Sequence, residues 1–216
     1  MNESPFLPRH LIQLFVQPVR FFTGHPDLEK RANLVLAMWI VGIARVADEI
    51  TELADRAELG LPRPGWDQVG PIVTESWLGF WATALVAGVV SGLFLYWIGG
   101  WWFKVRLRFA GASDPAAKRA RVAYAYSSFV YAGAAVLLLL GETLLYVDFA
   151  AARSNSVIGL ILFPVFTIWS YVIGYKAAIT LFDLSLWKAR FWFFILPLLV
   201  IVVGYMLLVV AMLLGP

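Results

Sequence analysis

Residues Ser76–Phe103 read SWLGFWATALVAGVVSGLFLYWIGGWWF, 28 residues without a charged side chain. A helix needs about 20 mostly apolar residues to cross the hydrocarbon core of a bilayer, so this stretch predicts a membrane-spanning helix. The rest of the chain agrees: 61% of its 216 residues are hydrophobic and 14% are charged, against roughly 25% charged residues in a soluble domain. The sequence predicts an integral membrane protein and argues against a soluble enzyme or a disordered chain.

Three more stretches are long and apolar enough to cross a membrane. Residues 122–147 are interrupted only by Glu142 and residues 157–182 only by Lys176, whereas residues 191–215 carry no charge. Each exceeds the length that a spanning helix needs.

A fifth stretch is ambiguous, because it is uncharged only from Ala32 to Ala44. The positive-inside rule separates its alternatives, since short cytoplasmic loops collect Lys and Arg. Five spans with a cytoplasmic N-terminus place 12 basic residues inside and 3 outside, whereas four spans place 8 on each side. The sequence therefore predicts five spans, with the N-terminus inside and the C-terminus outside: residues 32–50, 72–103, 122–147, 157–182 and 191–215. The first helix is expected to continue beyond the bilayer as far as Gly60, a typical C-terminal residue of a helix.

The N-terminal residues predict a short amphipathic helix on the inner membrane surface, the alternative being a loose tail. Leu7, Leu11, Leu14 and Phe15 fall on one helical face, and Arg9, Gln13 and Gln17 on another. Such a helix lies in the interface with its apolar side toward the acyl chains. The predicted architecture is an all-α, polytopic membrane helix bundle, with a cytoplasmic arm (residues 1–31) before the five-span domain (residues 32–216).

Small residues recur at helical spacing in two of the spans. They are Ala84, Gly88 and Gly92 in the second span and Ser170, Gly174 and Ala178 in the fourth. Small side chains at every fourth position let helix backbones approach closely in lipid. These residues are predicted to pack helices, either within the bundle or at a homodimer face.

Polar residues inside the spans are the candidates for function. A stripe at helical spacing in the third span contains Tyr124, Ser128 and Tyr131 and ends at Glu142. It could line a water-filled path or form hydrogen bonds between helices.

Intramembrane charges are costly and usually find a partner or face water. The candidates are Arg45, Asp48, Glu49, Glu142 and Lys176. Two alternatives are open for Arg45: a contact with Glu142 across the bundle, or a pair with Asp48 or Glu49 on its own helix.

The loop between the second and third spans is basic. Its positive residues are Lys104, Arg106, Arg108, Lys118, Arg119 and Arg121. Each basic residue near a membrane adds on the order of 1 kcal/mol of attraction to anionic lipid. They are predicted to contact lipid headgroups on the cytoplasmic side, or to act only as topology determinants. Nothing in the loop suggests nucleic-acid binding.

Enzyme and cofactor signatures are absent from the sequence. There is no cysteine, and His10 and His25 lack the spacing of metal ligands. Neither a nucleophile elbow nor a phosphate-binding or dinucleotide loop is present. The sequence predicts no enzyme activity, no cofactor and no metal.

The order of several short motifs resembles the Yip-domain family, the Ypt/Rab-interacting multi-pass membrane proteins. The motifs are QPVRFF at residues 17–22, the Gly99-Gly100 pair, AYAYSS at 123–128, WSY at 169–171 and LSLWKA at 184–189. The resemblance covers roughly residues 14–212 and implies a five-helix membrane domain with a cytoplasmic N-terminus.

Eukaryotic relatives associate with small GTPases and with each other. Their Asp-Leu-Tyr-Gly-Pro motif precedes the first span, whereas its nearest match here, residues 67–71, precedes the second. The chain is more similar to a bacterial member of the family.

The leading hypothesis is a non-enzymatic protein of a bacterial cytoplasmic membrane, which acts as a scaffold or organiser through lipid and protein contacts, homo-oligomers included. The alternative is a transporter or channel that uses the third-span stripe. A continuous polar cavity that reaches the membrane midplane would favour transport, and a tightly packed bundle would favour a scaffold.

Overall fold

The computed structural model describes residues 4–24, 26–155 and 157–213. Every regular element within these ranges is a helix, so the predicted all-α class is confirmed there. The helices are α1 (Pro8–Val16), α2 (Pro18–Gly24), η1 (Pro26–Glu29), α3 (Arg31–Glu58), α4 (Trp66–Thr74), α5 (Trp77–Phe109), α6 (Ala117–Leu145), α7 (Phe149–Asn155), α8 (Val157–Leu181), α9 (Leu186–Arg190), the π-helical turn η2 (Phe191–Ile195) and α10 (Leu196–Leu213).

Four segments within the described residues are long and apolar enough to cross a membrane. They are Trp77–Phe109, Ala117–Leu145, Leu162–Leu181 and Leu186–Gly204. Helix α3, with 28 residues, is also long enough to cross but carries Arg45, Asp48 and Glu49 in its central part.

The helix bounds differ from the predicted spans where polar residues decide them. The predicted span 72–103 is divided, because the Ser76 side chain accepts a hydrogen bond from the Gly79 N–H and begins α5 at Trp77. Residues 72–74 belong instead to α4, and α5 continues past residue 103 through its basic end to Phe109. Apolarity marks the part of a helix that lies in lipid, whereas hydrogen bonds decide where the helix begins and ends.

Two other predicted spans also have different bounds. Helix α6 begins at Ala117 rather than at residue 122 and ends at Leu145, after which the short helix α7 follows. The predicted span 191–215 is divided between η2 and α10, and its last two residues lie outside the described ranges. The extension of α3 is as predicted, since it ends at Glu58 and Gly60 has a φ of 73°.

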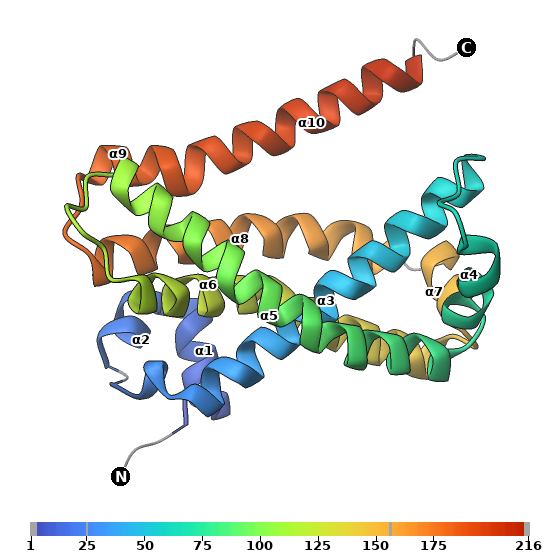
Figure 1. Cartoon of the computed structure of the whole chain (residues 1–216), viewed down its shortest axis with the longest axis horizontal. Helices are drawn as coiled ribbons and strands as arrows, with labels where there is room; N and C mark the ends of the chain where they lie inside the picture. The colour runs from blue at the N-terminus through green and yellow to red at the C-terminus, as the bar shows by residue number, and fades with distance from the viewer. Residues whose placement is uncertain (1–3, 25, 156, 214–216) are drawn as a thin grey trace.

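The long helices alternate in direction. Helices α3, α6 and α10 run from the end of the bundle that carries α1, α2 and α9 to the end that carries α4 and α7, and α5 and α8 run back (Figure 1). We call the first the basic end, because α5 finishes and α6 begins there with Arg106, Arg108, Lys118 and Arg121. The other is the distal end.

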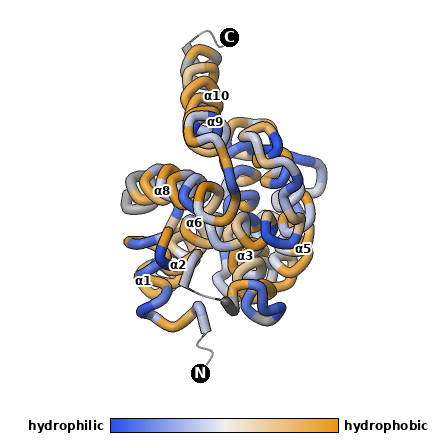
Figure 2. Tube along the Cα trace, turned by 90° about the vertical axis from the view of Figure 1, so that its left-hand side faces the viewer, coloured by the Kyte–Doolittle hydropathy of each residue, from blue (hydrophilic) through white to orange (hydrophobic). Residues whose placement is uncertain are grey.

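Helix α10 stands away from the rest of the molecule. It follows η2 at the basic end and then diverges from the other helices, with apolar residues along its length (Figures 1 and 2). Val200 and Leu207 are 63% and 64% exposed, as expected for a helix whose sides meet lipid or another protein rather than its own bundle.

Helices α3 and α5 touch through their backbones. A Cβ atom on Gly42 would lie 1.9 Å from the Gly88 carbonyl oxygen, and one on Gly92 would lie 2.3 Å from that of Met38. Both distances are far below van der Waals contact, so only glycine fits. The predicted small residues Ala84, Gly88 and Gly92 therefore lie inside the bundle.

The predicted N-terminal helix is present as α1, and one side of it packs on protein. Leu14 is fully buried, and the Trp169 indole N–H donates to the Phe15 carbonyl oxygen over 3.1 Å. The Phe15 ring also meets the Phe166 ring edge-on at 6.2 Å. The predicted apolar face therefore packs partly on the bundle, with Phe15 against α8, and its contact with the membrane surface stays a prediction.

We expect Leu14→Ala to lower the free energy of unfolding by about 2 kcal/mol, because truncating a buried leucine removes packing and leaves a cavity. The measurement is thermal unfolding of the purified protein, followed by tryptophan fluorescence. Ile12→Ala is the matched control, since Ile12 lies on the same helix and is 63% exposed. Equal effects of the two substitutions would contradict the packing of α1 on the bundle.

Candidate functional site

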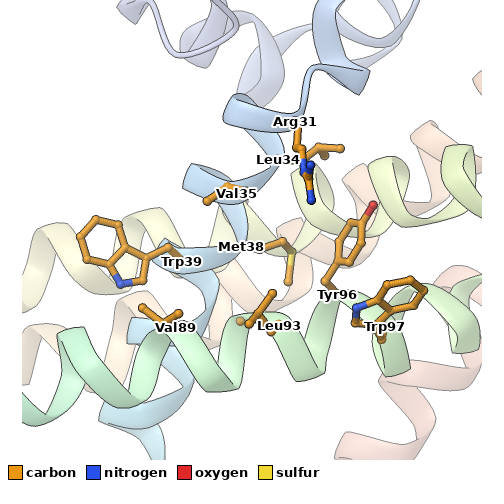
Figure 3. A pocket seen from close by; sticks show the side chains of 10 residues that line it. Arg31, Leu34, Val35, Met38, Trp39, Val89, Leu93, Tyr96 and Trp97 are labelled. Atoms are coloured by element: carbon orange, nitrogen blue, oxygen red, sulfur yellow. The ribbon is translucent and has the colours of Figure 1, made fainter.

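An apolar groove of about 520 Å³ runs between α3 and α5. Its walls are formed by Leu34, Val35 and Met38 of α3 and by Val89 and Leu93 of α5 (Figure 3). The groove exists because the two helices touch at Gly42, Gly88 and Gly92 and diverge toward the basic end. A concave apolar surface of this size on a membrane-embedded bundle suits an acyl chain.

Trp39 lines the end of the groove that lies nearer to the glycine contact. Its indole N–H donates a hydrogen bond to the Leu85 carbonyl oxygen over 3.0 Å, and the ring is 37% exposed. The ring therefore joins α3 to α5 while one face remains open to the groove (Figure 3).

Positive charge and aromatic rings gather at the other side of the groove. Arg31 is the first residue of α3, is exposed, and points toward Tyr96 (Figure 3). No carboxylate among the described residues forms an ion pair with it. Tyr96 and Trp97 complete this part of the lining.

A second arginine lies behind the same two rings. The Arg121 guanidinium carbon is 3.9 Å from the centre of the Trp97 ring and 5.5 Å from that of Tyr96. Its Nε is buried without a hydrogen-bond partner. Cation–π attraction holds the guanidinium there without neutralising it, so a second positive charge lies behind the aromatic end of the groove.

A pair of glycines positions Arg121. A Cβ atom on Gly100 would lie 2.4 Å from the Arg121 Cγ, and one on Gly99 would lie 2.2 Å from the Tyr124 ring. The missing side chains let α6 approach α5 closely. Sequence reasoning used this pair only for the family resemblance, although two glycines inside an apolar helix already indicate a close approach.

The six basic residues predicted to contact headgroups have different surroundings. Lys118 pairs with Glu29 at 2.7 Å, and Lys104 lies 3.9 Å from Asp114. The Arg106 guanidinium carbon lies 4.7 Å from the centre of the Phe193 ring. Arg108 and Arg119 are exposed and, with Arg121, have no ion-pair partner among the described residues. Arg31, which was not among the six, lines the groove directly.

The third-span stripe forms contacts between helices. Tyr124 packs over Gly99, and Tyr131 donates a hydrogen bond to the Asp48 carboxylate of α3 over 2.8 Å. Ser128 is partly buried between them. The fourth-span residues are also internal: Ala178 is fully buried, and Gly174 faces Ser127 of α6. The Ser170 hydroxyl donates to the Thr167 carbonyl oxygen of its own helix over 2.7 Å.

The charges that were predicted to lie within the membrane are only partly compensated. Arg45 pairs with Glu49 on its own helix at 3.1 Å, not with Glu142. The Lys176 ammonium lies 5.8 Å from the centre of the Tyr175 ring. Glu142 is buried, and the structure gives its carboxylate neither a hydrogen bond nor an ion pair with any described residue.

A family model for the Yip1 domain matches residues 12–208, which confirms the resemblance found in the sequence. The match runs from α1 into α10 and includes Arg31 and Arg121. No curated protein and no solved structure matches the chain.

Proposed function

We propose that this chain, which belongs to the Yip1 domain family, acts as a non-enzymatic membrane organiser that holds an anionic phospholipid in the groove between α3 and α5. Proteins of this family are generally non-enzymatic membrane trafficking proteins, and the chain is a multi-pass membrane protein. The observation that carries the proposal is Arg31, a cation at one end of an apolar groove that has no carboxylate partner in the part of the chain that the structure describes. A phosphate beside Arg31 and an acyl chain between the helices would match this arrangement.

Charge also supports a location for the groove. The basic end carries most of the lysines and arginines of the chain, and cytoplasmic surfaces collect them. We propose that this end lies at the inner surface of a bacterial cytoplasmic membrane. The chain would then cross the membrane five times, with the N-terminus inside and the C-terminus outside. Arg31 then lies at the depth of anionic headgroups in the inner leaflet.

The exposure of helix α10 is consistent with the protein contacts that we propose for the scaffold. Its sides are exposed along most of the described length. A second copy of the chain or another membrane protein could pack there in place of lipid. The transport alternative has less support, because Tyr124 and Tyr131 of the proposed path contact neighbouring helices.

Lipid binding is tested by replacing Arg31, which lines the groove, together with Arg121, which lies behind its aromatic end. Each basic residue adds about 1 kcal/mol of attraction to anionic lipid, so Arg31→Gln with Arg121→Gln should weaken phosphatidylglycerol binding by roughly 30-fold. Native mass spectrometry of the protein released from nanodiscs measures the lipid that it retains.

Arg190→Gln is the matched control, because Arg190 is exposed on α9 at the same end of the bundle but outside the groove. This variant should retain as much phosphatidylglycerol as the unmodified protein. If the double variant also retains it, the groove does not select anionic lipid and the proposal is wrong.

A further inference from the structure

A second pocket lies in the half of the bundle toward the distal end, and its lining is acidic. It has a volume of about 520 Å³ and is bounded by α3, α6, α7 and α8. Four carboxylates line it, those of Asp48, Glu52, Asp55 and Glu142. The only cation in the lining is Arg153, and Phe149 and Phe163 form apolar parts of the wall. We call this the outer pocket.

Two of the four carboxylates are neutralised by arginines of the chain. Glu52 pairs with Arg56 at 2.5 Å, one turn along α3. Asp55 and Glu58 both pair with Arg153 of α7. Arg153 is therefore already paired at the rim of the outer pocket, and its charge does not neutralise Asp48 or Glu142.

Glu142 is the unusual member of the set. It is 9% exposed and lines the outer pocket from α6, and no described residue donates a hydrogen bond to its carboxylate or pairs with it. Asp48 receives one hydrogen bond, from the Tyr131 hydroxyl over 2.8 Å. Its helix neighbour Arg45 is bonded to Glu49. An unpaired carboxylate inside a membrane protein is costly, and a bound cation would remove that cost.

We propose that the outer pocket binds the protonated amino group of an aliphatic amine, with Glu142 as its counter-ion and Asp48 as a second acceptor. An ammonium group has N–H donors for carboxylate oxygens that lack partners. The aromatic wall formed by Phe149 and Phe163 suits the attached alkyl chain and attracts the cation. A pocket of this volume falls within the range of small-molecule sites.

A metal ion fits the outer pocket less well than an ammonium group. Metal ions need several ligands that converge on one point. No group of three carboxylate or imidazole side chains converges in this way among the described residues. An ammonium group needs only the two acceptors that Glu142 and Asp48 offer.

The shared chemistry has two sources, a free amine such as putrescine and the headgroup of phosphatidylethanolamine. The full chain is placed in nanodiscs of phosphatidylcholine, whose quaternary ammonium has no N–H donor. Putrescine is then added in one arm, and part of the phosphatidylcholine is replaced by phosphatidylethanolamine in the other. Either addition should raise the midpoint of thermal unfolding, and the arm that does so identifies the source.

Glu142→Gln should weaken the binding of the effective amine, measured through the shift of the unfolding midpoint, at least tenfold. If Glu142→Gln does not fold, Asp48→Asn gives the same comparison. Glu75→Gln is the matched control, because Glu75 is exposed between α4 and α5 and lies outside the outer pocket. Three results would overturn the proposal: no stabilisation in either arm, full stabilisation of Glu142→Gln, or equal stabilisation by NaCl at the same ionic strength.

Discussion

Gly42→Ala is expected to lower the free energy of unfolding by about 3 kcal/mol, at the upper end for overpacking. The added methyl group would lie 1.9 Å from the Gly88 carbonyl oxygen and 2.6 Å from the Gly92 backbone nitrogen. Backbone atoms cannot turn aside as a flexible side chain does, so α3 and α5 must separate. Their separation breaks this close backbone contact and widens the groove between them.

The measurement is thermal unfolding in nanodiscs, followed by the fluorescence of the 10 tryptophans. Gly141→Ala is the matched control, since nothing lies within 4 Å of a Cβ atom at that position. Alanine favours a helix over glycine by up to about 1 kcal/mol, so this variant should be as stable as the unmodified protein or more so. Equal stability of Gly42→Ala and Gly141→Ala would contradict the backbone contact.

The sequence predicts the parts of the fold that one-dimensional patterns record. Apolar length identifies α5, α6 and α8, and Gly60 identifies the end of α3. The predicted span 72–103 includes the polar residues Thr74 and Glu75, and the pattern does not show that a hydrogen bond to Ser76 begins a new helix there. The packing of α1 on α8 is hidden for a similar reason, since an apolar helix face looks the same whether protein or lipid covers it.

The candidate site depends on pairs that are distant in the sequence. The small residues of α5 suggest a close approach, but only the structure shows that α3 is the partner and that the two helices diverge into a groove. Arg31 contributes to the predicted charge bias, yet nothing local separates it from the other basic residues. Glu142 stands out in the sequence as an intramembrane charge, whereas its lack of a partner follows from the folded arrangement.

The topology depends on whether α3 crosses the membrane. Its charges exclude it from the four segments that are apolar enough to cross by composition. Gly42 touches α5 at Gly88 and Gly92, near the middle of a segment that is apolar enough to cross the membrane. We therefore expect the centre of α3 to lie at the same depth as the centre of α5. Its 28 residues extend over about 42 Å, which exceeds the hydrocarbon core of roughly 30 Å. The Arg45–Glu49 pair and the Tyr131 hydrogen bond to Asp48 lower the cost of its charges.

We therefore expect the two ends of α3 to lie on opposite sides of the membrane. The chain has no cysteine, so single substitutions can be labelled on intact cells with a membrane-impermeant maleimide against a clean background. Pro62→Cys and Ser154→Cys should react from outside, whereas Thr23→Cys and Ser113→Cys should react only after permeabilisation. All four positions are exposed, so the accessibility of the thiol does not limit the reaction. If Thr23→Cys and Pro62→Cys react from the same side, α3 does not cross the membrane. The topology would then no longer place Arg31 at the anionic headgroups of the inner leaflet.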